Sequence, residues 1–170
     1  MIDIDRINKI FDEYVSNYDM SNEKISTKYY HTYRVCEQSL NICKSLNLSD
    51  EDTLLAYLIA LLHDIGRFEQ HRRFGTYNDL KSMDHASFGC TLLFEDVLIR
   101  SFITDDRYDE IIKNAIMNHN KYSIDKGLNE RELLHAKIIR DADKIDIVNN
   151  IVNLGHIDIV SDDSKISDLV

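Results

Sequence analysis

Two adjacent residues with metal-binding side chains, His63 and Asp64, follow the apolar segment 57–62. Imidazole nitrogen and carboxylate oxygen together suit divalent ions such as zinc, iron and manganese. Neighbours within a helix lie about 100° apart and do not share a face. At a helix end the backbone is free to turn both side chains toward one ion. The pair therefore indicates a metal site at the end of a helix, although a His-Asp dipeptide alone is common by chance.

Residues on both sides of this pair follow a recognisable order. His31 stands three residues before an Arg-Val pair, the apolar helix ends in Leu-Leu-His-Asp-Ile-Gly, and an Ala-Asp pair comes later. This order resembles the HD superfamily of metal-dependent phosphohydrolases. The resemblance spans about residues 25–154, and its most specific parts are Leu61–Gly66 and Ala142–Asp146.

The resemblance implies one divalent ion held by four residues: His31, His63, Asp64 and Asp143. Asp141 is a competing choice for the last ligand, and Asp143 is preferred because it occupies the Ala-Asp position. Asp146 shares a helix face with Asp143. Asp141 and Asp146 are therefore predicted to contact and orient the ligands without binding the metal themselves. For Asp146 the alternative is an ion pair with Lys144 or a solvated face.

Two further histidines lie between the His-Asp pair and the last Asp. In some members of the superfamily two histidines in this interval bind a second metal, and here His85 and His119 occupy the interval in that order. In the mononuclear alternative they support the ligands or contact phosphate. His135 and His156 are expected to be ordinary core histidines.

Basic residues follow the His-Asp pair in a chain that is otherwise acidic. Between Arg67 and Lys81 four Lys or Arg face two acids. Arginine matches the geometry of phosphate. The residues predicted to bind substrate are Arg67, Arg72, Arg73 and Lys144, and those predicted to take part in catalysis are Asp64, Arg67 and Lys144. The alternative is that the Arg72-Arg73 pair only solvates a loop.

No acid occupies the positions two to four beyond Asp64, so no dedicated general acid is expected. Glu69 is the nearest candidate for a proton shuttle.

The resemblance implies a hydrolase that acts on a nucleotide or another small phosphoester through metal-activated water. Its cofactors would be one or two ions of zinc, manganese, iron, cobalt, nickel or magnesium. One alternative is a di-iron oxygenase of the same fold, which uses the same ligands. Another is a non-catalytic metal-binding regulatory module. The Gly-Tyr-Pro motif of cyclic-dinucleotide esterases is absent.

Helical periodicity must supply the elements that position these residues. Apolar spacings of three and four predict helices over residues 3–18, 29–46, 49–63, 84–100, 104–119 and 130–154. The last of these is predicted with a possible break near Ala142, and residues 67–83 read as a loop or short broken helices. No strand alternation is present. The expected fold is an all-α helical bundle of the HD type, formed as a single domain over residues 1–170.

Composition agrees with a helical globule that has a substantial core. The chain of 170 residues has no proline, 5 glycines and 44% hydrophobic residues. Its net charge of −10 argues against nucleic-acid polymers and anionic membranes as partners, but not against a small anionic phosphoester. Three cysteines without a CxxC motif, no signal peptide and no long apolar run favour the cytoplasm. The sequence does not indicate an oligomeric state, and Ser161–Ser164 reads as a turn or a new helix cap.

Overall fold

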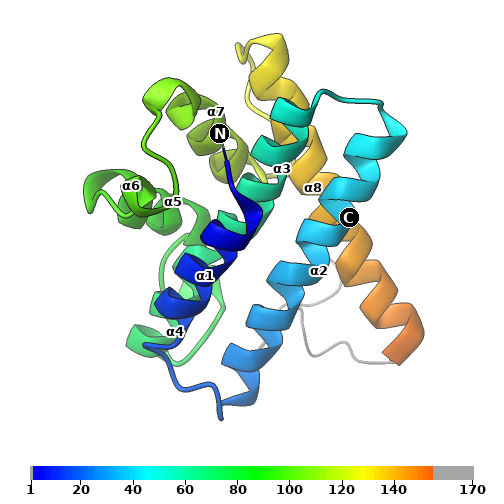
Figure 1. Cartoon of the computed structure of the whole chain (residues 1–170). Helices are drawn as coiled ribbons and strands as arrows, with labels where there is room; N and C mark the ends of the chain where they lie inside the picture. Colours follow the sequence, from blue (N-terminus) through cyan, green and yellow to red (C-terminus); the bar gives the residue numbers. More distant parts are fainter. Residues whose placement is uncertain (1, 155–170) are drawn as a thin grey trace.

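The computed structural model describes residues 2–154, and these residues form helices and turns without a strand (Figure 1). The α-helices are α1 Ile4–Val15, α2 Glu23–Ser45, α3 Asp50–Leu62, α4 Ile65–Phe74, α5 His85–Cys90, α6 Ile99–Phe102, α7 Asp109–Asn118 and α8 Glu130–Leu154. Three short helical turns connect them: η1 Asp79–Lys81, η2 Thr91–Glu95 and η3 Asp106–Tyr108. The all-α prediction is confirmed. The predicted turn at Ser161–Ser164 and the prediction for His156 lie outside the described residues.

Polar side chains mark where the first three helices begin. Asp3, Asn22 and Ser49 each accept a hydrogen bond from a backbone N–H of the turn that follows, and so cap α1, α2 and α3. Such caps satisfy N–H groups that have no partner within the helix. Ser49 is the cap that the sequence predicts for the third helix.

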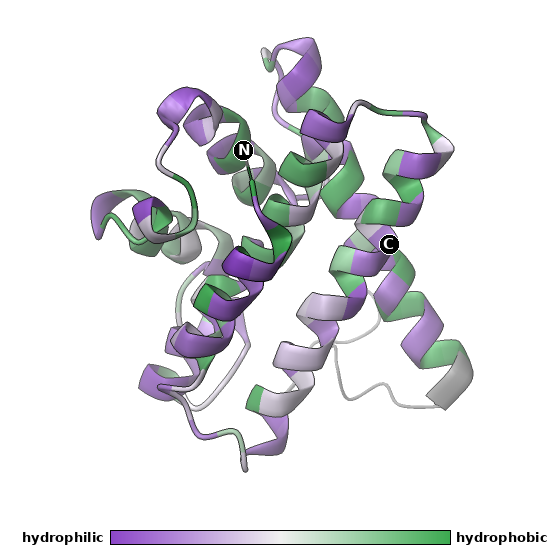
Figure 2. Ribbon diagram, in the orientation of Figure 1, coloured by the Kyte–Doolittle hydropathy of each residue, from purple (hydrophilic) through white to green (hydrophobic). Residues whose placement is uncertain are grey.

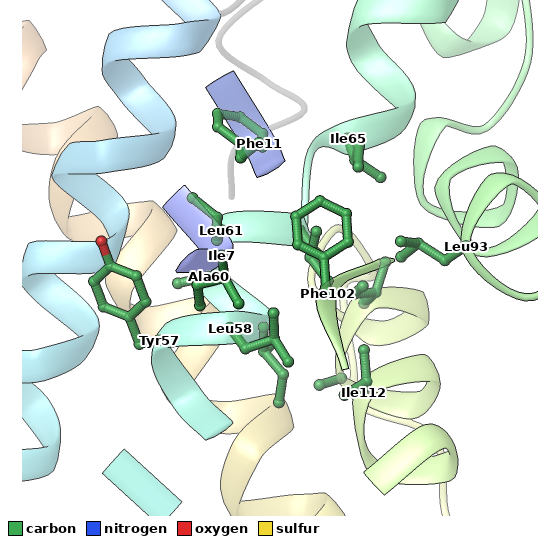
Figure 3. Close-up of a cluster of buried hydrophobic side chains, with 14 of the residues drawn as sticks. Ile7, Phe11, Tyr57, Leu58, Ala60, Leu61, Ile65, Leu93, Phe102 and Ile112 are labelled. Atoms are coloured by element: carbon green, nitrogen blue, oxygen red, sulfur yellow. The ribbon is translucent and has the colours of Figure 1, made fainter. Parts of the chain in front are cut away.

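Helix α3 is the centre of the bundle. Its residues Leu55–Leu62 are all buried, so the helix has no solvent face along this stretch. A helix that is apolar on every side must lie inside the protein. Figure 3 shows Leu58 and Leu61 of this helix packed among Ile7 and Phe11 of α1. The residues that follow α3, His63 and Asp64, are therefore delivered into the interior.

The outer helices pack around this centre by their apolar faces. In Figure 2 hydrophobic and hydrophilic residues alternate along α1 and α8, as expected for helices with one buried face. Helix α2 runs beside both α3 and α8, and α7 packs against α8 (Figure 1). This packing brings the middle of α2, the end of α3, the end of α7 and the middle of α8 to a common region.

Helices α4 and α5 approach each other at two glycines, Gly66 and Gly89. A Cβ atom on Gly66 would lie 2.6 Å from the carbonyl oxygen of His85 and 2.8 Å from the amide nitrogen of Gly89. Only a residue without a side chain allows this approach. Gly66 therefore lets the first turn of α5, which carries His85, lie directly against the turn that carries Asp64.

Two parts of the sequence prediction differ from the structure. Residues 65–74 form the regular helix α4, where a loop or short broken helices were predicted from residue 67; Phe68, Glu69 and Gln70 are buried, so polar residues obscure the apolar period. The single helix predicted over 84–100 is interrupted: α5 continues into the π-helical turn η2, and Val97 then adopts a positive φ of 62° before α6. Helix α8 continues through Ala142 without a break.

Among the described residues no helix combines the length and the apolar character that crossing a membrane requires.

Candidate metal centre

The six residues that the sequence predicts as metal ligands come together inside the bundle. They are His31 in α2, His63 after α3, Asp64 before α4, His85 at the start of α5, His119 after α7 and Asp143 in α8. Five of them are at most 4% exposed, and the side chain of Asp143 is 17% exposed. Buried polar groups need hydrogen bonds or an opposite charge, so such a cluster requires compensation.

Asp64 lies between two groups of ligand atoms. Its Oδ2 is 3.7 Å from Nε2 of His31 and 3.6 Å from Nε2 of His63. Its Oδ1 is 3.4 Å from Nε2 of His85 and 3.7 Å from Nε2 of His119. The carboxylate therefore faces a different pair of histidines with each oxygen, and the two groups share it.

Asp143 completes the first group. Its Oδ1 is 3.1 Å from Nε2 of His31 and 3.8 Å from Nε2 of His63. Asp141, the alternative for this position, is exposed and lies outside the cluster. The two residues are close together on α8, but only the side chain of Asp143 reaches the histidines.

Backbone carbonyls orient His63 and His119. Nδ1 of each ring lies 2.7 Å from the carbonyl oxygen three residues earlier, that of Ala60 and that of Ile116 respectively. A carbonyl can only accept, so each Nδ1 carries the proton and each Nε2 is bare when the ring is neutral. Both rings thus present an Nε2 lone pair to the cluster.

Carboxylates orient the other two histidines. Nδ1 of His31 lies 2.7 Å from Asp146, and Nδ1 of His85 lies 2.6 Å from Asp79. Burial opposes ionisation of Asp79, but the hydrogen bond from His85 and a nearby guanidinium lower its pKa to about 2. For Asp146, hydrogen bonds from His31 and Arg34 likewise lower the pKa against the effect of burial. Both carboxylates are therefore acceptors, and these two rings also turn a bare Nε2 inward.

The four Nε2 atoms that face the cluster are all hydrogen-bond acceptors when the rings are neutral, and they lack donors. Nε2 of His85 and Nε2 of His119 face each other at 3.0 Å. Nε2 of His31 and Nε2 of His63 are buried and have no hydrogen-bond partner in the part of the chain that the structure describes. With all four Nδ1 atoms donating outward, the four Nε2 atoms face only one another and carboxylate oxygens, and they need a cation or added protons.

The pKa shifts of the four histidines also indicate that the cluster needs positive charge. Burial lowers the pKa of His63 to about 4 and that of His85 to about 4. Burial also opposes protonation of His31 and His119, but neighbouring carboxylates outweigh it: Asp143 and Asp146 raise the pKa of His31, and Asp64 raises that of His119. In each group the lowered pKa of one histidine favours the neutral ring that binds a metal ion, and the other histidine keeps a proton to higher pH than an ordinary histidine.

The spacing of these atoms fits divalent ions. Ligand atoms about 2.1 Å from one ion, at angles near 90–110°, lie roughly 3.0–3.4 Å apart. The distances of 3.0–3.8 Å within the two groups are close to these values. Histidine nitrogen and carboxylate oxygen atoms, present together in each group, are the ligands that zinc, iron, manganese and related ions take.

The predicted phosphate-binding arginine nearest the cluster is Arg67, and it is tied to protein acceptors. Its Nη1 donates to Gln70, to the carbonyl of Tyr77 and to Asp79, while its Nε remains 3.7 Å from Asp64. Arg67 thus reaches the cluster and at the same time holds the loop after α4.

The other predicted bases lie farther out. Arg72 and Arg73 are both paired with the buried carboxylate of Glu69, and their side chains are 57% and 52% exposed. Glu69, the candidate proton shuttle, is occupied by these two partners and by Tyr18. Lys144 is exposed and lines a shallow depression of α8 with Ile145, Val148 and Asn149. Its predicted contact with substrate stays a prediction.

Two residues of the site were not predicted from the sequence. Lys28 places its ammonium 2.8 Å from Oδ2 of Asp64, in a buried position. It precedes His31 by three residues on the same helix face, and this spacing is a signal that could have identified it. Asp79 contacts His85 from the loop before α5, and no periodic pattern in the sequence points to it.

Comparison with known proteins agrees with this geometry. The family model described as HD domain matches residues 29–147, well over half of the chain. Comparison with curated proteins and with solved structures gives no match. The matched range contains all six candidate ligands, from His31 to Asp143. The chain belongs to the HD domain family.

Proposed function

We propose that this protein is a metal-dependent phosphohydrolase that acts on a small phosphoester. One observation carries the proposal: four buried histidines turn their Nε2 atoms toward the two oxygens of one shared carboxylate, Asp64. Membership of a family composed mostly of metal-dependent hydrolases supports the same interpretation. The first ion would be held by His31, His63, Asp64 and Asp143, and the second by Asp64, His85 and His119.

Bound divalent ions would supply an activated water near neutral pH and neutralise charge on a phosphoester. The chain's own residues prepare the place for that chemistry. Asp146 and Asp79 fix the tautomer and the direction of His31 and His85, and the helix ends that carry His63 and His119 do the same through backbone carbonyls. Rings held in this way need no rearrangement when an ion arrives.

The ligands of the cluster differ in how much of their surface water can reach. His31 and His63 are fully buried, and the most exposed ligand side chain is that of Asp143. Low exposure strengthens the interactions of an anionic substrate with the charges at the site. A substrate would therefore approach past Asp143.

Metal analysis followed by a screen of phosphoesters for released phosphate tests this proposal. Wild-type protein should bind metal and release phosphate from at least one ester. His63→Ala should lose both properties. His135→Gln is a matched control, because His135 is buried away from the cluster and pairs with Asp52. Full turnover by His63→Ala would overturn the mechanism.

The same experiment separates the two alternatives. Tightly bound iron with substrate oxidation that requires O₂, and no phosphate release, would indicate the di-iron oxygenase. Bound metal without phosphate release and without oxidation of a substrate would indicate the non-catalytic metal-binding regulatory module.

A further inference from the structure

Lys28 is a buried residue whose ammonium has one hydrogen-bond partner. Its side chain is 11% exposed, and Nζ donates to Oδ2 of Asp64 at 2.8 Å. An ammonium has three N–H donors. Among the described residues Nζ donates no other hydrogen bond, and the centroid of the Tyr77 ring lies 5.8 Å from it. Two of its donors are therefore free for another acceptor beside Asp64.

The position of Lys28 suits it to an anionic ligand of this site. Its Nζ lies at the oxygen of Asp64 that also faces His31 and His63. A lysine loses much hydration when it is buried, and it is found there when a charged partner repays this loss. Asp64 is the carboxylate that the two histidine groups share. An anion bound beside this carboxylate would therefore be within reach of the ammonium of Lys28.

The remaining bases near the site are less available. Nη1 of Arg67 is bound by three acceptors that belong to the protein, and Arg72 and Arg73 share Glu69. Lys144 lies on the exposed side of α8. Of these five basic side chains, only Lys28 combines burial, direct contact with a candidate ligand and unused donors.

Counting charges narrows the class of anion. Asp79 is neutralised by Arg67, and Asp146 by Arg34. Asp64 and Asp143 contribute two negative charges and Lys28 one positive charge, which leaves the protein part of the site near −1. One divalent ion would make the site net positive by about one charge, and two ions by about three. The phosphate of a monoester carries about −1.5 to −2 at neutral pH, whereas a diester carries one negative charge, so a monoester balances a two-ion site more closely.

We propose that Lys28 binds the phosphate of the substrate and that the substrate is a phosphomonoester. This inference rests on the proposed function of the same site. Lys28 would keep one N–H on Asp64 and donate the other two to phosphate oxygens, and so hold the phosphate beside the shared carboxylate. A charged hydrogen bond of this kind corresponds to a loss of at least about tenfold in affinity when it is removed.

Three variants test the role of Lys28: Lys28→Met, Lys28→Arg and, as a control, Lys9→Met. The side chain of Lys9 is 79% exposed on α1, so its replacement removes the same charge away from the site. The readouts are metal content, binding of inorganic phosphate to the metal-loaded protein by calorimetry, and kcat and KM for 4-nitrophenyl phosphate and bis(4-nitrophenyl) phosphate. Wild type should prefer the monoester. Lys28→Met should retain its metal, bind phosphate at least about tenfold more weakly and raise KM for the monoester. Lys28→Arg should recover part of the affinity, and Lys9→Met should match wild type.

Unchanged phosphate affinity in a metal-loaded Lys28→Met protein would overturn the inference, as would loss of metal from both Lys28 variants, which indicates a purely structural ion pair. A wild type that prefers the diester would overturn the substrate class. The proposed function fails separately: a wild-type protein that hydrolyses no ester but binds phosphate through Lys28 contradicts the hydrolase and leaves the binding role in place.

Discussion

Nε2 of His85 and Nε2 of His119 face one another at 3.0 Å in the interior of the bundle, and neither ring has a proton on that side when both are neutral. Two lone pairs at this distance repel each other unless a metal ion or a proton lies between them. The arrangement is thus one half of a metal site held ready by hydrogen bonds on the far sides of the two rings.

Metal binding should release protons, because each group of ligands contains one histidine whose pKa is raised. In the metal-free protein neighbouring carboxylates raise the pKa of His31 and of His119 against the effect of burial, while burial lowers those of His63 and His85 to about 4. His31 and His119 therefore keep a proton to higher pH than an ordinary histidine, and a metal ion must displace that proton. Metal affinity should therefore rise with pH across the range in which His31 and His119 lose their protons, and fall in acid. Calorimetry in buffers of different ionisation enthalpy measures the proton count, and a count of zero would contradict these protonation states.

Removing the charge of Asp79 should lower the affinity for the ion bound by His85 and leave the affinity for the other ion unchanged. Asp79 accepts from Nδ1 of His85 at 2.6 Å, and it is tied in turn to Arg67 and Gln70. Loss of a carboxylate that supports a histidine ligand costs about 10–100-fold in metal affinity. Asp79→Asn should show this loss in a metal titration for one of two ions.

Asp105, a partly exposed acid on the surface, provides the control for that titration. It pairs with Arg107 on the surface, so Asp105→Asn removes the same charge without touching the cluster. Equal metal binding by Asp79→Asn and Asp105→Asn would show that the carboxylate does not act through His85.

Gly66→Ala should disturb the second group of ligands. The added Cβ would come within 2.6 Å of the carbonyl oxygen of His85, a backbone atom that cannot move without shifting α5. Overpacking of this kind costs about 1–3 kcal/mol, so Tm should fall and the affinity of one ion should decrease. Gly89→Ala is a close control: its Cβ would meet neighbours at 3.5 Å or more, which is ordinary contact. A Gly66→Ala protein as stable as Gly89→Ala would show that the close approach is not required.

The candidate ligands could be named from the sequence because their types follow a fixed order along the chain. His63 and Asp64 come directly after an apolar segment, and His31 precedes an Arg-Val pair. The family match and the all-helical structure confirm the family and the fold class that this order implies. What the order does not contain is the distance between residues far apart in the sequence, such as Asp64 and Asp143.

Residues outside the periodic helices were harder to predict. Asp79 lies in a loop, and its contact with His85 depends on how Arg67 and Gln70 hold that loop. The helix α4 was missed because its buried face includes the polar residues Glu69 and Gln70. Hydropathy alone cannot show that a polar side chain is buried with its partners, and this is where tertiary contacts override the local pattern.

The number of metal ions per chain most directly tests whether Asp64 is the shared centre of a metal site. Elemental analysis after reconstitution and removal of free metal would compare wild type, Asp64→Asn and His85→Ala. Because Asp64 faces both pairs of histidines, we expect two ions in wild type, one in His85→Ala and substantial loss of both in Asp64→Asn. Full retention of metal by a folded Asp64→Asn protein, or no metal in wild type, would contradict the central role of this carboxylate.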